Sequence, residues 1–126
     1  MDYRDRKKIV LLEERTVWRN LSKAAFLMAD PDRTAELTVV GTLNELWTAL
    51  KAGTYQGVIV PFNPVGITRR GLYEELSQIV PDAWIGYMLN GFAAGADEVK
   101  PILFLPFNGE QIREFIVSCP SPRCKV

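Results

Sequence analysis

The sequence predicts an α/β fold in which helices cover both faces of a parallel sheet. Five short, apolar runs are spread along the 126 residues, as strands buried on both faces of such a sheet require. Between most of these runs, apolar residues recur at helical spacing. Alternation of this kind favours right-handed strand–helix–strand units, and the length suits one domain. We therefore expect a doubly wound, five-stranded, three-layer α/β/α architecture.

The first strand is expected at Lys8 to Leu12 (KIVLL), and two acids, Glu13 and Glu14, follow it. A helix is expected from Thr16, and Asp30-Pro31-Asp32 should stop it because a residue before proline avoids the α region. The side chains expected to face inward from this helix are Val17, Trp18, Leu21, Ala24, Ala25 and Met28.

The second strand is expected at Glu36 to Val40, and Thr42-Leu43-Asn44-Glu45 has the sequence of a capping box. In that motif the hydroxyl and the carboxylate satisfy free amides at the start of a helix. This helix should end at Gly53, before a third buried strand at Gly57 to Val60.

The second half of the chain continues the alternation, with one interruption. The expected elements are a helix carrying Leu72, Leu76 and Ile79, strands at Trp84 to Leu89 and Ile102 to Leu105, and a last helix at Glu110 to Ser118. The interval from Asn90 to Lys100 has room for at most a turn or two, so we expect a shortened fourth helix there. We expect one domain at residues 7–118, with tails at 1–6 and 119–126.

Composition excludes several kinds of function. Lys+Arg and Asp+Glu both number 15, so the formal charge is zero and bulk binding to nucleic acid or to an anionic membrane is not expected. The chain has no histidine, which excludes catalytic triads and imidazole metal ligands. No apolar run is long enough to cross a bilayer, and we expect a cytoplasmic protein. Cys119 and Cys124 are expected to be reduced residues of the tail.

Five motifs, in their order and spacing, resemble the receiver domain of two-component response regulators, a flavodoxin-like fold. The motifs are IVLLEE at residues 9–14, Glu45-Leu46-Trp47, GVIVPFNP at 57–64, AGAD at 94–97 and LPF at 105–107. In that family a histidine kinase passes a phosphoryl group to an aspartate at the end of the third strand, with the assistance of magnesium.

The resemblance implies that this chemistry is lost here. The phosphoacceptor position is Pro61, the hydroxyl position is Leu89 and the lysine position is Leu105. Nucleophile, phosphate positioning and charge neutralisation are therefore missing together. Glu13 and Glu14 remain as a vestigial acid pair, and we expect no bound metal, no cofactor and no enzymatic activity.

Two further expectations concern loops that follow the carboxyl ends of the strands. The resemblance implies a cis peptide bond at Leu105-Pro106, since the family's Lys-Pro peptide is usually cis. The loop after the third strand is apolar, and we consider Phe62, Asn63 and Val65 as a docking loop for a partner. The alternative is that this loop packs locally over the end of the sheet. Arg15, Arg19, Arg69 and Arg70 are expected to belong to solvated faces.

Two functions remain open. The leading hypothesis is a pseudo-receiver that cannot be phosphorylated and that binds another signalling protein or domain, with a homodimer as a further possibility. The alternative is a flavodoxin-like module that binds a small ligand or nucleotide around Glu13, Asn63 and Asn90.

Overall fold

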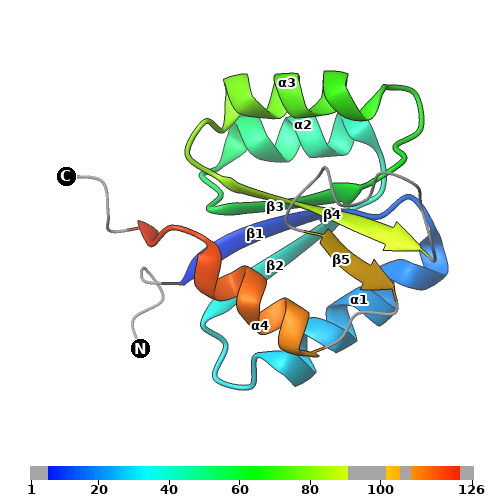
Figure 1. Cartoon of the computed structure of the whole chain (residues 1–126). Coiled ribbons are helices and arrows are strands. Elements are labelled where there is room, and N and C mark those ends of the chain that lie inside the picture. Colours follow the sequence, from blue (N-terminus) through cyan, green and yellow to red (C-terminus); the bar gives the residue numbers. More distant parts are fainter. Residues whose placement is uncertain (1–5, 91–101, 106–108, 123–126) are drawn as a thin grey trace.

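The structure, a computed structural model, describes residues 6–90, 102–105 and 109–122. Its centre is a parallel sheet with strand order β2-β1-β3-β4-β5 (Figure 1). The strands are β1 (Lys7–Leu12), β2 (Ala35–Val40), β3 (Gly57–Pro61), β4 (Trp84–Asn90) and β5 (Ile102–Leu105). The described helices are α1 (Thr16–Ala29), α2 (Leu43–Ala52), α3 (Arg69–Ile79) and α4 (Gly109–Ser118).

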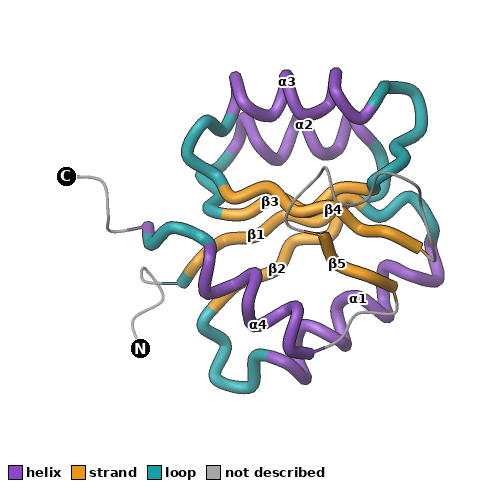
Figure 2. Tube along the Cα trace, in the orientation of Figure 1, coloured by secondary structure: helices purple, strands orange, loops and turns teal. Residues whose placement is uncertain are grey.

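Of the described helices, α1 and α4 cover one face of the sheet, and α2 and α3 cover the other (Figure 2). On β1, Ile9 and Leu11 pack in one core with residues of α1 and α4, whereas Val10 and Leu12 pack in a second core with α2 and α3. This alternation follows from the two-residue period of a strand, and it makes β1 apolar on both faces. The predicted parallel α/β sheet with helices on both sides is confirmed. The expected shortened fourth helix lies outside the described residues.

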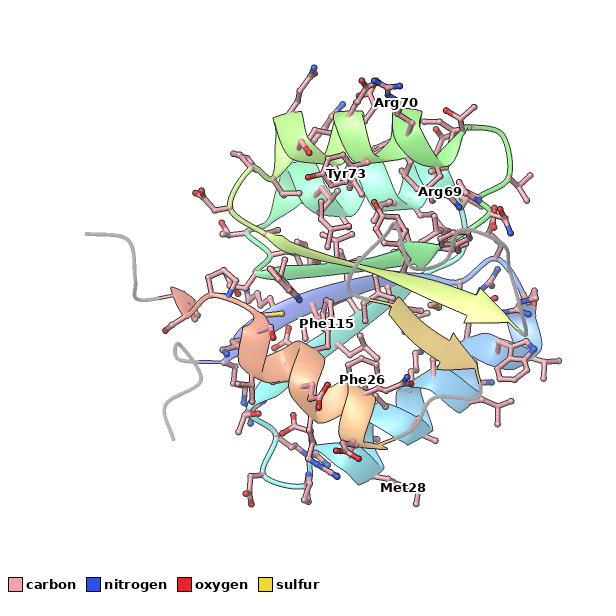
Figure 3. All side chains as sticks on the ribbon, viewed as in Figure 1. Phe26, Met28, Arg69, Arg70, Tyr73 and Phe115 are labelled. Atoms are coloured by element: carbon pink, nitrogen blue, oxygen red, sulfur yellow. The ribbon has the colours of Figure 1, made fainter. Side chains whose placement is uncertain are left out.

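The prediction of the buried face of α1 was wrong for four of its six residues, Val17, Leu21, Ala24 and Met28, whereas Trp18 and Ala25 are partly buried. Val17, Leu21 and Met28 are 71%, 51% and 83% exposed, and the buried residues of this helix are Ser22, Phe26 and Ala29. Figure 3 shows Met28 pointing away from the molecule, while Phe26 and Phe115 lie between the sheet and the helices. The sequence of α1 contains two apolar rows, and periodicity alone does not say which row is buried.

The orientation of α1 buries Phe26 in the core and is accompanied by a polar contact on the same side. Arg19 lies on the side of the helix that carries Phe26, and its Nε donates to the carbonyl of Glu13 at 2.8 Å. Val17 and Leu21 lie on the opposite side, which is exposed.

Two other local expectations are refined by the structure. The hydroxyl of Thr42 accepts from the amide of Glu45 at 3.1 Å, as a capping box requires, but the Glu45 carboxylate accepts from Gly41 and not from Thr42. The core also extends past the expected domain end, because Cys119 is buried against β3 and does not belong to a solvated tail. Burial raises the pKa of the Cys119 thiol to about 12.

Candidate functional site at the carboxyl ends of the strands

The carboxyl ends of the strands meet at one edge of the sheet, where open α/β folds bind ligands. Leu11 pairs with Ile59, so Glu13 and Pro61 each lie two residues further on, at the same level. Pro61 pairs in turn with Met88 of β4. The acid that ends β1 and the residue at the phosphoacceptor position therefore stand on neighbouring strands, as the sequence predicts.

The carboxylate of Glu13 is occupied by Arg15. Arg15 Nε lies 2.7 Å from Glu13 Oε1, Arg15 Nη2 lies 3.1 Å from Oε2, and the Arg15 amide donates to Oε1 at 2.9 Å. Glu13 is only 2% exposed, whereas Arg15 is 44% exposed. The hydrogen bond to this carboxylate raises the pKa of Arg15. A forked guanidinium–carboxylate pair of this kind neutralises the acid and fixes its orientation.

Arg19 binds the same turn through backbone carbonyls. Besides its bond to Glu13, its Nη2 donates to the carbonyl of Glu14 at 3.2 Å. Its guanidinium lies against Gly41, just after β2, where a Cβ would collide with it. Two arginines of the first helical segment thus hold the turn between β1 and α1.

Above β3, an aromatic ring and a third arginine cover the strand ends. Phe62 is buried beneath the guanidinium of Arg69, whose Cζ lies 3.7 Å from the ring centroid. Arg69 Nη1 also lies 3.4 Å from the Phe62 carbonyl, and the ring of Tyr87 meets Phe62 edge-on at 6.4 Å. Burial raises the pKa of Tyr87 to about 12. The cation–π contact holds Arg69 over the carboxyl end of β3.

The expected docking loop separates into a buried and an exposed part. Phe62 is a core residue at 3% exposure, so its assignment as a docking residue is corrected in favour of local packing. Asn63 is exposed, and Val65 is 69% exposed. The reason is the partnership with Tyr87 and Arg69, which draws the ring inward. Only Asn63 and Val65 remain accessible to a partner.

The remaining positions are placed by the backbone of the sheet. Leu89 pairs with Phe104, and Leu105 pairs with Asn90, so both leucines lie near the carboxyl ends of β4 and β5. Pro106 and its peptide bond lie outside the described residues.

The residues at this edge do not fit magnesium. A hard dication prefers several oxygen ligands, but the Glu13 carboxylate is paired with Arg15 and Pro61 stands where a further carboxylate is expected. No cluster of three potential metal ligands occurs within the described residues. The arrangement neutralises the buried Glu13 carboxylate with an arginine of its own chain.

Sequence reasoning missed the three arginines that organise the site. Arg15, Arg19 and Arg69 were expected on solvated faces, yet each contacts the carboxyl end of β1 or β3. One signal in the sequence could have identified Arg15, because it stands two residues after a glutamate that ends a buried strand. Arg70 does lie on the outer side of α3, as expected (Figure 3).

Comparison with solved structures shows the receiver fold. The signal receiver domain of a DNA-binding response regulator from Colwellia psychrerythraea 34H superposes with a TM-score of 0.70 at 11% identity, covering 88% of this chain and 98% of that one. A chemotaxis response regulator of Vibrio cholerae gives 0.68 at 12% identity, covering 89% and 97%. A receiver domain protein from Bacillus halodurans gives 0.63 at 16% identity, covering 89% and 95%.

The fold is therefore that of a response regulator receiver domain. No family model matches the sequence, and no curated protein matches it either. Within the described residues, no helix combines the length and the apolar character needed to cross a membrane.

Proposed function

We propose that this chain is a receiver-like signalling domain that binds another signalling protein without accepting a phosphoryl group and without an enzymatic activity of its own. The observation that carries the proposal is the pairing of Glu13 with Arg15 beside Pro61. Phosphotransfer to a receiver needs a carboxylate nucleophile, a cation and donors for the phosphoryl oxygens. Here the nucleophile position has no side-chain nucleophile, and the nearest buried acid is already neutralised.

Three arginine contacts support the same proposal. Arg15 and Arg19 fix the β1–α1 turn, and Arg69 holds Phe62 over the end of β3. These contacts satisfy inside the chain the groups that would otherwise face a phosphate or a metal. They also weigh against the small-ligand alternative, because Glu13 is not available to a ligand and Phe62 covers the strand ends.

The surface of α1 supports a role in protein binding. Four apolar residues of α1 follow one another at intervals of four, three and four residues, so they lie in one row on a single face of the helix. This α1 row consists of Val17, Leu21, Ala24 and Met28. Each of them is exposed. An exposed row of apolar side chains on a soluble α/β domain is typical of a surface that a partner covers.

The partner surface is tested by capture from a lysate of the cells that make the protein, with the immobilised chain as bait. The double variant Leu21→Asp, Met28→Asp should lose the captured protein, because two charges are placed in the α1 row. Val65→Asp is the matched variant on the exposed loop after β3, and it should retain capture. If the α1 variant retains the partner and the Val65 variant loses it, the loop is the docking surface.

Phosphorylation is tested separately. After incubation with magnesium and acetyl phosphate, the intact mass of the protein should not change, while a phosphorylatable receiver treated in parallel gains one phosphoryl group. A gain of one phosphoryl group on an acid of this chain would overturn the proposal, whatever the capture experiment shows.

A further inference from the structure

Strand β2 is an edge of the sheet, and its polar groups divide into two sets. The carbonyls of Thr34 and Val40 accept from the amides of Lys7 and Glu13, so even-numbered residues of this segment point their backbone groups toward β1. Odd-numbered residues therefore point theirs outward, since backbone groups alternate along a strand. The outward set comprises Ala35, Leu37, Val39 and Gly41.

Carboxylates close the two ends of this outward set. The amide of Ala35 donates to Asp30 Oδ2 at 3.0 Å, and the amide of Gly41 donates to Glu45 Oε1 at 2.7 Å. Between these caps, the amides and carbonyls of Leu37 and Val39 have no partner among the described residues. An open edge is thus limited to a short segment in the middle of β2.

This open segment carries none of the features that usually protect an edge strand. Proteins blunt exposed edges with proline, bulges, inward-pointing charges or very short strands. β2 runs in register with β1 over its whole length, from Ala35 to Val40. It contains neither proline nor glycine, and Glu36 is its single charged residue.

We propose that β2 pairs with β2 of a second copy of this chain, antiparallel, with Thr38 on the two-fold axis. In this register Leu37 faces Val39 of the second copy, and Val39 faces Leu37. Each of these pairs exchanges two backbone hydrogen bonds, because both residues present their amide and carbonyl outward. The amides and carbonyls of Leu37 and Val39 are then satisfied, and the two sheets become continuous.

The side chains agree with this self-pairing. Leu37 and Val39 both pack on the side of the sheet that carries α1, so across the axis they meet as apolar neighbours. The two Thr38 side chains meet on the other side as a close, non-hydrogen-bonded pair, a favourable combination in antiparallel sheets. Glu36 faces Val40 of the second copy, so no like charges oppose each other.

The surface beside the strand is hollowed on the side of α1. A cavity of about 240 Å³ lies there, with an apolar part formed by Phe26, Leu27, Ala35 and Leu37 and a charged part formed by Arg6, Lys23, Asp30, Arg33 and Glu36. Val39 of the second copy, placed opposite Leu37, would enter on this side of the sheet. The formal charge of the chain is zero, so long-range repulsion does not oppose association.

Disulfide trapping tests the register. In a Cys124→Ser background, Thr38→Cys should give a covalent dimer on mild oxidation, because Cα atoms of such a pair are about 4.5 Å apart, within disulfide range. Glu36→Cys is the matched control on the same strand face. It should stay monomeric, because residue 36 faces residue 40 of the second copy. The absence of a Thr38→Cys dimer, or equal cross-linking of both variants, would overturn the proposed register.

Sedimentation equilibrium tests the association without cross-linking. The wild type should show a reversible monomer–dimer equilibrium, while Thr38→Lys and Thr38→Glu alone should each weaken the dimer by about tenfold, since like charges meet at the axis. An equal mixture of the two variants should associate again as a heterodimer. A wild type that stays monomeric at every concentration, or a mixture that stays as weak as its components, would contradict the proposal.

The same measurement separates this inference from the proposed function. The α1 row lies on another surface, so Leu21→Asp, Met28→Asp should leave the monomer–dimer equilibrium unchanged while it abolishes partner capture. Loss of the dimer in that variant would place the self-association on α1 and overturn the role of β2.

Discussion

The guanidinium of Arg15 and the carboxylate of Glu13 form a forked ion pair in which the acid is buried and the base is half exposed. The pair joins the end of β1 to the residue that precedes α1. The Glu13 carboxylate is buried, and Arg15 supplies three hydrogen bonds to it, two from the guanidinium and one from the backbone amide. The pair thus contributes both to the stability of the fold and to the arrangement of the strand-end site.

Removal of Arg15 should destabilise the fold. Arg15→Ala leaves the Glu13 carboxylate buried with fewer donors, and we expect a loss of about 1–3 kcal/mol in the free energy of unfolding. The measurement is urea denaturation. Arg70→Ala is the control, because Arg70 and Glu74 are exposed and 3.9 Å apart, and a change within about 0.5 kcal/mol is expected. If both substitutions lower the free energy of unfolding equally, the buried Glu13–Arg15 pair contributes no more to stability than the exposed Arg70–Glu74 pair.

A side chain at Gly57 should disturb the contact between β3 and α4. A Cβ there would lie 2.6 Å from Cys119 Sγ and 3.0 Å from Phe115 Cε2, so Gly57→Ala should cost about 1–3 kcal/mol. Gly53→Ala is the control, because its Cβ would meet its nearest neighbour at 3.7 Å. In thermal denaturation, adding Cys119→Ala to Gly57→Ala should recover part of the stability that Gly57→Ala loses. If the two substitutions instead lower stability additively, the proposed contact between position 57 and Cys119 is contradicted.

Stability should fall at alkaline pH. Burial raises the pKa of Cys119 from 9.0 to about 12 and that of Tyr87 from 10.0 to about 12. Between these values the unfolded chain has released protons that the folded chain still holds. Fewer protons are then bound in the unfolded state, so the free energy of unfolding decreases as pH rises.

The contribution of each group is measured by urea denaturation across this pH range. Cys119→Ala should flatten the decrease from its onset near pH 9.0, and Tyr87→Phe should flatten it above pH 10.0. The slope with pH is compared, not the absolute stability, because both substitutions also change packing. An unchanged slope in both variants would exclude these groups as its source.

The exposed and buried rows of α1 should respond differently to substitution. Met28→Lys should change the free energy of unfolding by less than about 0.5 kcal/mol, because Met28 is among the most exposed apolar residues. Phe26→Ala should cost about 3–5 kcal/mol, since it empties a core position. Guanidinium denaturation of the two variants checks this, and a large loss for Met28→Lys would mean that the α1 row is packed in solution.

Much of the fold could be predicted because β1 and β3 are buried on both faces. Their apolar runs are unambiguous, and the capping threonine at position 42 marks the start of α2 in the sequence. The orientation of α1 could not be predicted, because its sequence contains two apolar rows and periodicity alone does not say which of them is buried. Cys119 was misplaced because its burial depends on how α4 packs across the sheet.

The sequence predicted where the candidate site lies, but it did not predict how its side chains are paired. Strand order brings Glu13 and Pro61 together, as the resemblance to the receiver domain implies. That Arg15 occupies the acid and Arg69 covers Phe62 depends on side-chain geometry at loop ends, where sequence periodicity carries no information.

The central proposal is that the receiver fold here has no phosphoacceptor. The decisive measurement is the intact mass of the wild-type protein after incubation with magnesium and acetyl phosphate, with a competent receiver domain treated alongside. We expect an unchanged mass, because Pro61 offers no nucleophile and Glu13 is held by Arg15. A mass increase of one phosphoryl group, mapped to an aspartate or glutamate of this chain, would contradict the proposal.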